Sequence, residues 1–434
     1  MPSFRRGISI PLRGSSPRVR RAIGLLAAVG LLLATGSPLA ADSAHELASA
    51  HFLVQYTVGT GDDAVAAEYA ALVRDAMEEA YRVLVTEGGF SLLPGQISVL
   101  IRRSEDAEYG SEYLDEDAQG NPRPVIEIAP ESSMKDAIAD LVVRPTVEEE
   151  VRSTAAHELF HAVQETLALR GTYDFSEIWL TEALATWAQE LVVPRADDYL
   201  DSAIDFLVGP DSLSFFSRTY DAGIFWTFVA ARHGAEAVRH VMTASAAYEG
   251  RYVVDAAFRE KHLTFDDLWE AFAVALAAGT LPDGDVIATL LPDPSATVRS
   301  PRTKGLALPP SVWRGEWQGG TLTIGEVNAR NPSPILPEFA EDPVGSPLRV
   351  AHAYGIDLLD LTSAAARPFE ILLSGDAGTA FRANVVIGQG ATQRTARLVP
   401  EAPLQIEGAS GRIRIVVTRG EAGTGAYTLT VREG

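Results

Sequence analysis

The chain has 434 residues, of which 47% are hydrophobic and 22% charged, and this composition excludes a generally disordered chain. Its formal net charge of -22 argues against nucleic acid as a partner, because phosphate binding requires a basic surface. The chain has no cysteine, which excludes disulfides, thiolate metal ligands and lipidation at cysteine. Any bound metal must therefore be held by nitrogen and oxygen atoms.

Residues 1–41 are typical of a bacterial export signal. Arginines are frequent between residues 5 and 21, residues 23–35 (IGLLAAVGLLLAT) are apolar, and residues 37–41 (SPLAA) are small enough for cleavage. The apolar segment is shorter than the roughly 20 residues that span a bilayer. We expect cleavage near Ala41, no stable membrane span after it, and a secreted or periplasmic protein. The alternative is that the segment is retained as an N-terminal anchor.

Residues 42–195 are predicted to form an α+β region with a mixed sheet. Apolar periodicity and turn residues predict its elements in the following order: a strand over 51–58, a helix over 62–86, a strand over 97–101, a hairpin over 113–129, and helices over 146–168 and 176–191. We interpret residues 42–95 as part of this fold, the alternative being a removable pro-segment.

The remainder of the chain is predicted to contain a helical and an all-β part. Residues 196–280 are almost entirely helical in pattern, and residues 281–310 form a linker rich in Pro, Asp and Ser. Short β runs over residues 311–434 predict a β-sandwich. Its end, GTGAYTLTV at 423–431, resembles that of bacterial pre-peptidase C-terminal domains, small β-sandwiches that often follow secreted peptidases.

The helix predicted over 146–168 contains the stretch HELFH. Residues four apart project from the same face of a helix, so His157 and His161 can bind one metal ion through imidazole nitrogens. Zinc suits such ligands, and Glu158 would act as general base on zinc-activated water. The alternative interpretation is an amphipathic helix with two ordinary histidines.

A catalytic zinc ion needs a third protein ligand, and the next helix offers Glu182 within WLTEALATW. Glu182 follows His161 by enough residues for one helix to end, turn and return alongside. Its neighbours on that helix are apolar, and burying a carboxylate among them would be costly without a cation nearby.

With these residues the chain resembles the gluzincin metallopeptidases, which include the thermolysin-like and membrane-alanyl aminopeptidase families. These combine His-Glu-x-x-His with a downstream helix of the type Trp-Leu-x-Glu-Ala. The resemblance implies His157, His161 and Glu182 as ligands of one zinc ion per chain, Glu158 as base, and a zincin-like α+β catalytic domain whose edge strand lines the cleft. The stretch YDAG also matches a Tyr-x-x-Gly of the aminopeptidase branch, which implies that Tyr220 stabilises the oxyanion. His233 and His240 are rival donors.

Two departures from the family pattern alter the expectation. The Gly-x-Met-Glu-Asn stretch that binds a free amino terminus in aminopeptidases is missing, which favours an endopeptidase; Glu127 remains a candidate substrate contact. We expect an extended substrate to pair with the edge strand near residues 123–129. Thr186 occupies the position of a family aspartate, and its hydroxyl can hydrogen-bond a ligand histidine.

The sequence therefore predicts an exported zinc metallopeptidase that acts on peptide or protein substrates, and it does not define the oligomeric state. One alternative is a non-catalytic exported binding protein whose metal is structural or absent. The other is a zinc hydrolase of non-peptide substrates.

Overall fold

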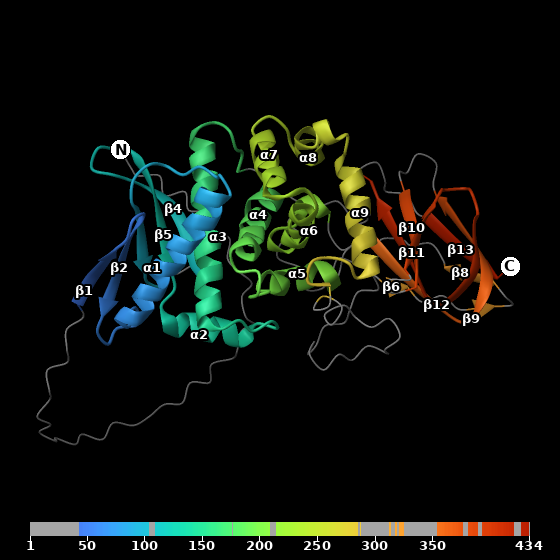
Figure 1. Cartoon of the computed structure of the whole chain (residues 1–434), viewed down its shortest axis with the longest axis horizontal. Coiled ribbons are helices and arrows are strands. Elements are labelled where there is room, and N and C mark those ends of the chain that lie inside the picture. The colour runs from blue at the N-terminus through green and yellow to red at the C-terminus, as the bar shows by residue number, and fades with distance from the viewer. Residues whose placement is uncertain are drawn as a thin grey trace, which may run out of the picture. The chain divides into compact units, whose positions relative to one another are not determined.

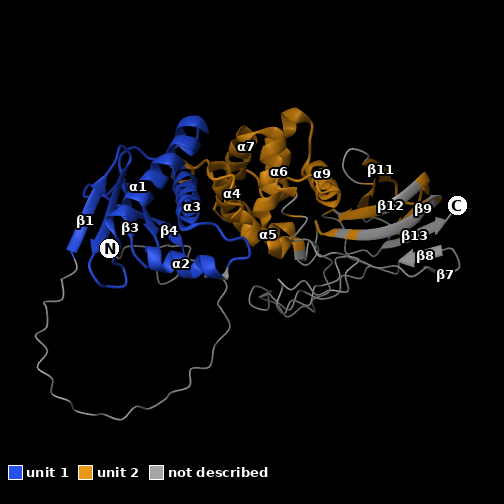
Figure 2. Ribbon diagram, turned by 60° about the horizontal axis from the view of Figure 1, so that its bottom comes forward, with its two compact units in different colours: residues 1–166 blue, residues 167–434 orange. Residues whose placement is uncertain are grey.

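The computed structural model describes residues 43–103, 109–175, 177–208, 214–284, 287, 312–313, 317–318, 321–324, 354–375, 381–388, 393–420 and 427–433. The predicted signal peptide and most of the predicted linker over 281–310 lie outside these residues. The chain divides into two compact units, Met1–Thr166 and Leu167–Gly434, and the division falls within the helix α3, Val147–Leu169 (Figure 2).

The first unit contains a five-stranded mixed sheet. Its strands are, in spatial order, β1 (Ser43–Ala48), β2 (Phe52–Val58), β3 (Ile97–Ile101), β5 (Pro122–Ile128) and β4 (Gly110–Glu116). The three central strands are parallel, whereas β1 and β4 are antiparallel to their neighbours. Apolar residues alternate along β2 and β3, as expected for strands that bury one face. The predicted α+β region with a mixed sheet is therefore confirmed at this level.

The edge strand next to the motif helix is β4, so the prediction that residues 123–129 form the edge is wrong. Strand β5 pairs with β3 on one side and with β4 on the other. The hairpin turn is held by Asp117, whose Oδ1 accepts hydrogen bonds from the backbone N–H groups of Gln119 and Asn121, both at 2.9 Å. The sequence defines such a hairpin but not which of its two strands joins the rest of the sheet.

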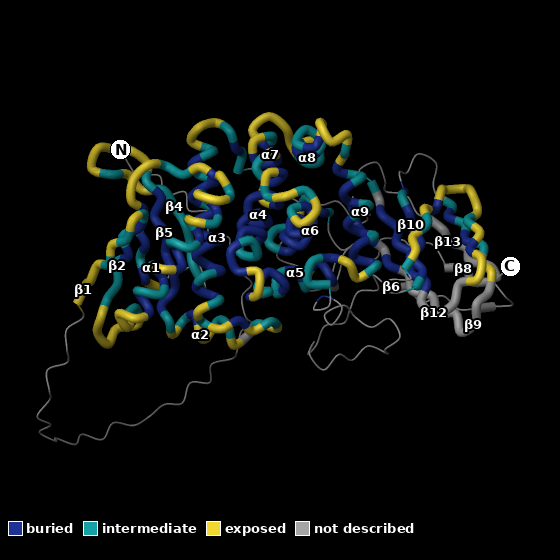
Figure 3. Tube along the Cα trace, viewed as in Figure 1, coloured by how far each residue is buried: buried dark blue, intermediate teal, exposed yellow. Residues whose placement is uncertain are grey.

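Helices α1 (Ala67–Tyr81) and α3 lie on the same face of this sheet (Figure 1). Arg152 of α3 donates two hydrogen bonds, from Nε and Nη2, to the carboxylate oxygens of Glu79 of α1, and each is 2.7 Å long. The Tyr69 hydroxyl donates to the Ala129 carbonyl at the end of β5, at 2.7 Å. A six-residue π-helix, η1 (Arg82–Glu87), continues α1, and α2 (Glu131–Asp140) precedes α3. The middle of α3 is buried almost all round (Figure 3), which fixes the motif residues on a rigid element.

The second unit begins with helices, as predicted separately for residues 176–191 and for residues 196–280. They are α4 (Ile178–Val192), α5 (Tyr199–Val208), α6 (Gly223–His233), α7 (Ala235–Ser245), α8 (Arg251–Ala257) and α9 (Phe265–Ala278), with 3-10 turns η2 (Phe215–Ser217), η3 (Tyr220–Ala222) and η4 (Arg259–Lys261). A capping box between Thr264 and Asp267 starts α9. Helices α4, α6 and α9 and the turn η2 share a buried aromatic cluster made of Trp179, Phe215, Phe225, Trp226, Phe265 and Trp269.

The C-terminal part of this unit is all-β. Its strands are β6 (Val312–Trp313), β7 (Trp317–Gln318), β8 (Thr321–Ile324), β9 (Ile356–Gly375), β10 (Phe381–Ile387), β11 (Arg394–Leu398), β12 (Leu404–Arg419) and β13 (Tyr427–Glu433). They are hydrogen-bonded in one path, β11-β10-β12-β9-β13-β8-β7, with β6 against β9. The β content is thus as predicted, while the pairing joins the described strands through the long β9 and β12 instead of dividing them into two separate sheets.

The all-β part is attached to α9 by charged groups. Arg382 of β10 contacts Asp267 at 2.9 Å and Glu270 at 3.1 Å, and Asn384 donates to Glu270 at 2.8 Å. The buried Arg414 donates to the carbonyl of Ala277 near the end of α9. Within the described ranges, no helix combines the length and apolar character that crossing a membrane requires.

Candidate metal centre

The motif helix has a well-defined start that sets the register of its histidines. Thr146 and Glu149 form reciprocal hydrogen bonds between side chain and backbone at the first turn, at 2.8 and 3.2 Å. Glu148 and Glu149 also place negative charge at the positive end of the helix dipole. The following buried positions carry His157, Glu158 and, one turn later, the partly buried His161.

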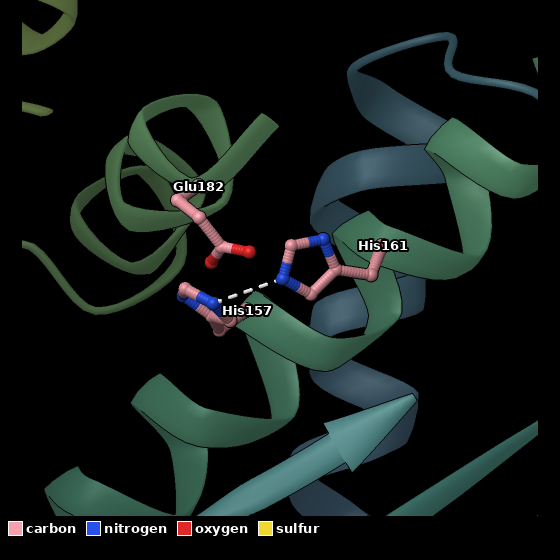
Figure 4. Close-up of side chains that lie close together, drawn as sticks. All are labelled: His157, His161 and Glu182. Atoms are coloured by element: carbon pink, nitrogen blue, oxygen red, sulfur yellow. Dashed lines mark hydrogen bonds between the residues drawn. The ribbon is translucent and has the colours of Figure 1, made fainter. Parts of the chain in front are cut away.

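The two histidines converge through the nitrogen atoms that a metal would use. Nε2 of His157 and Nε2 of His161 are 3.1 Å apart, and the rings are nearly perpendicular at 79° (Figure 4). A tetrahedral zinc ion with bonds of 2.0–2.1 Å separates two ligand nitrogens by about 3.3 Å. The two imidazoles therefore already have close to the spacing that a shared zinc ion requires.

Glu182 of α4 completes the group predicted from the sequence. One ligand atom each from His157, His161 and Glu182 lie within 4.8 Å of one another (Figure 4). Glu182 is 6% exposed, and contacts on either side of it in the sequence hold α4 in place. Trp179 stacks on Trp226 with ring centroids 5.8 Å apart, and Thr186 lies against Gly223 at the start of α6. Two imidazoles and one carboxylate form a ligand set that suits zinc.

The electrostatics around His161 also favour a cation. Burial raises the pKa of Glu112 well above its usual range, and the charges of Glu165 and Glu158 raise it further. Burial likewise raises the pKa of Glu165, an effect that His161 opposes. A metal ion bound by the histidines would stabilise the ionised form of both carboxyl groups. The residues present thus fit a divalent metal ion in spacing, ligand type and charge.

Strand β4 passes directly against the motif helix. A Cβ atom added to Gly110 would lie 3.0 Å from Cγ of Glu158 and 2.8 Å from Cγ2 of Thr154. Glycine is needed at this position because a side chain would separate the strand from the helix. Strand β4, which stands at one end of the sheet order, therefore begins close to the predicted general base.

The other sequence candidates have mixed outcomes. The Thr186 hydroxyl donates to the carbonyl of Glu182 in its own helix at 2.9 Å, and its role toward a ligand histidine stays a prediction. Glu127 is buried and forms an ion pair with Arg102. Tyr220 begins η3, directly before the start of α6 that lies against Thr186, and its catalytic role stays a prediction.

His233 and His240 are the rivals of Tyr220 as donors to the oxyanion, and that role stays a prediction for both. The His233 ring packs on Phe258 with centroids 5.2 Å apart, and burial lowers its pKa. The His240 side chain is 56% exposed and lies 3.8 Å from Glu236 on the same helix.

Two residues near the site were missed by the sequence analysis. Gln164 is fully buried, and its Oε1 lies 2.7 Å from Nδ1 of His161. Its position three residues after His161 on one helix was a readable signal. Glu112 had no such signal, because its position next to the motif helix depends on the placement of β4.

A second group of possible ligands consists of Glu190, Asp197 and Asp283, all partly exposed. Burial and the neighbouring Asp283, Asp197 and Asp198 raise the pKa of Glu190 to about 8. The Tyr199 hydroxyl donates to Asp283 at 2.9 Å. Acidic groups of this kind are common at protein surfaces without a metal, and no function is assigned to this one.

Comparison of the sequence with models of protein families and with curated proteins finds no match.

Proposed function

We propose that the protein is an exported zinc-dependent endopeptidase of the gluzincin type. The observation that carries the proposal is the convergence of His157, His161 and Glu182, with Glu158 on the same buried turn of α3. The resemblance of both motif helices to those of gluzincins supports the same conclusion. The N-terminal export signal supports a secreted or periplasmic site of action.

His157, His161 and Glu182 would hold the metal through two Nε2 atoms and a carboxylate oxygen. When bound, zinc lowers the pKa of water and polarises a carbonyl group. The Glu158 carboxylate would accept a proton from the attacking water and deliver it to the nitrogen of the leaving amine. The Tyr220 hydroxyl would donate a hydrogen bond to the carbonyl oxygen of the scissile bond.

The substrate would bind as an extended chain along the outer edge of β4. Among the described strands β4 pairs only with β5, and it occupies the end of the sheet order. Strand addition satisfies the backbone groups of a peptide whatever its sequence, which suits cleavage within a chain. This replaces β5, the strand proposed from sequence, with its hairpin partner.

Cleavage of peptides blocked at both ends tests the proposal. The purified protein is expected to cut denatured casein and N-acetylated, C-amidated peptides at internal bonds, identified by mass spectrometry. Glu158→Gln should retain the metal and lose activity by about 10²-fold or more, because general acid–base catalysis contributes about 10²–10⁴-fold.

The matched control is Glu148→Gln, an exposed position in the first turn of the same helix, which should keep full activity. Equal activity of Glu158→Gln and the wild type would contradict the assigned base. Bound zinc without cleavage of any peptide would contradict the peptidase proposal and favour a hydrolase of non-peptide substrates.

A further inference from the structure

Gln164 is a buried polar residue that contacts His161 and that the proposed mechanism does not use. It lies one turn beyond His161 on α3. Its exposed fraction is 0%, so it has no contact with solvent. Its side-chain oxygen Oε1 lies 2.7 Å from Nδ1 of His161. An amide oxygen only accepts hydrogen bonds, so Nδ1 of His161 must be the donor.

This hydrogen bond determines the state of the other ring nitrogen. In a neutral imidazole only one nitrogen carries the proton, so a proton on Nδ1 leaves a lone pair on Nε2. Nε2 is the atom of His161 that points to His157, at 3.1 Å. The tautomer selected by Gln164 is therefore the one that can bind a metal through Nε2.

The same bond restrains the orientation of the ring. The His161 side chain is only partly buried, and the bond from Nδ1 to Gln164 is one of the contacts that restrain rotation of its ring about the bond to Cβ. Gln164 is on a buried face where water cannot replace its oxygen as an acceptor. Residues three apart on a helix are neighbours, so the rigid helix holds acceptor and ring together.

We propose that Gln164 is the positioning residue for His161, which it holds by accepting the Nδ1–H bond in the tautomer and orientation required for metal binding. The inference rests on the proposed metal site. Thr186, the residue expected from sequence to hold a ligand histidine, has its hydroxyl on a carbonyl of its own helix. Gln164 fills this role for His161 from within the motif helix itself.

Zinc affinity of two variants tests the inference. Gln164→Met keeps a similar volume but removes the acceptor, and Gln164→Glu keeps an acceptor and adds charge. Loss of such a supporting bond reduces metal affinity by about 10–100-fold. We expect that loss in Gln164→Met and at least wild-type affinity in Gln164→Glu, because a carboxylate makes the bonded imidazole a stronger ligand.

The control is Gln189→Met, the same substitution at a glutamine of α4 whose amide donates to Asp198 at 2.8 Å. It should leave zinc affinity unchanged. Affinity is measured by competition with a chromophoric chelator, and the visible spectrum of the cobalt-substituted protein reports the ligand geometry. Circular dichroism of each metal-free variant establishes that it folds.

The outcomes separate this inference from the proposed function. A wild type that binds no zinc overturns both. A wild type that binds zinc, with folded Gln164→Met of equal affinity and an unchanged cobalt spectrum, overturns the role of Gln164 alone. Equal losses of zinc affinity in Gln164→Met and Gln164→Glu would mean that the shape of the Gln164 side chain, and not its acceptor oxygen, supports the site, and would also overturn the inference. If Gln164→Met does not fold, Gln164→Glu decides: affinity at or above the wild-type value with an unchanged cobalt spectrum supports the positioning role, and a loss of affinity overturns it.

Discussion

Replacement of Gly223 by alanine tests how α4, the helix that carries Glu182, is held in place. The backbone of Gly223 is helical, with φ -55° and ψ -35°, so any residue can adopt its conformation. A Cβ atom there would lie 2.8 Å from Cγ2 and 3.0 Å from Cβ of Thr186. Carbon atoms in contact prefer about 3.5–4.0 Å. Glycine is therefore required for space.

Two effects oppose each other in Gly223→Ala. Alanine favours a helix by about 1 kcal/mol over glycine, and by less at a first helical position. Overpacking a tight contact costs about 1–3 kcal/mol. We expect a net loss of about 1–2 kcal/mol in the free energy of unfolding, measured by urea denaturation. Zinc affinity should also fall, because Thr186 lies one turn beyond Glu182.

The second substitution Thr186→Ser identifies the contact responsible. It removes Cγ2, the atom at 2.8 Å, and keeps the hydroxyl that donates to Glu182. In the Thr186→Ser background, Gly223→Ala should cost at least about 1 kcal/mol less, a coupling typical of contacting residues. A Gly223→Ala protein as stable as the wild type, or additive effects of the two changes, would refute the explanation.

Two further predictions concern charged groups of the second unit. Arg382→Ala should lower the free energy of unfolding by about 1–2 kcal/mol, because Arg382 joins β10 to the carboxylates of Asp267 and Glu270. The control Arg397→Ala removes a side chain that is 61% exposed and should lower it by less than about 0.5 kcal/mol. Equal losses for the two variants in urea denaturation would contradict the role of Arg382. The pKa of Glu190 is raised to about 8 in the folded protein from an ordinary 4.5, so the unfolded chain loses this proton first and stability falls as pH rises from about 4.5 to 8. Glu190→Gln should therefore match the wild type near pH 4.5 and be more stable by about 1–2 kcal/mol at pH 8, a figure reduced for the partial exposure of the group. Thermal unfolding at the two pH values checks this, and an unchanged difference between them would contradict it.

Much of the fold follows from local sequence patterns. Alternation predicted β2 and β3, whose buried positions recur every second residue, and the apolar and turn patterns predicted α3 and α4. The exposed strand β1 was missed, since its sequence SAHELA has no β pattern and it is held by pairing with β2. The order of β4 and β5 is a matter of tertiary pairing, which no local pattern encodes.

The residues of the candidate site likewise fall into those that local sequence patterns place and those that only tertiary packing places. His157, Glu158 and His161 could be grouped from sequence because helix geometry alone places them together. Glu182 was found through its apolar helix, where a carboxylate stands out. Gln164 could have been found by helix spacing as well. The carboxyl group of Glu112 depends on how a strand passes a helix far along the chain, and only the folded structure reveals it.

Metal content is the most direct test of the central claim that His157, His161 and Glu182 bind zinc. The purified protein, prepared without chelators, is measured by inductively coupled plasma mass spectrometry beside His161→Ala and His240→Ala. His240 is an exposed histidine outside the ligand group and serves as the control. The account predicts one zinc ion per chain in the wild type and in His240→Ala, and loss of zinc in His161→Ala. A wild type without zinc, or zinc retained at full affinity in His161→Ala, would contradict it.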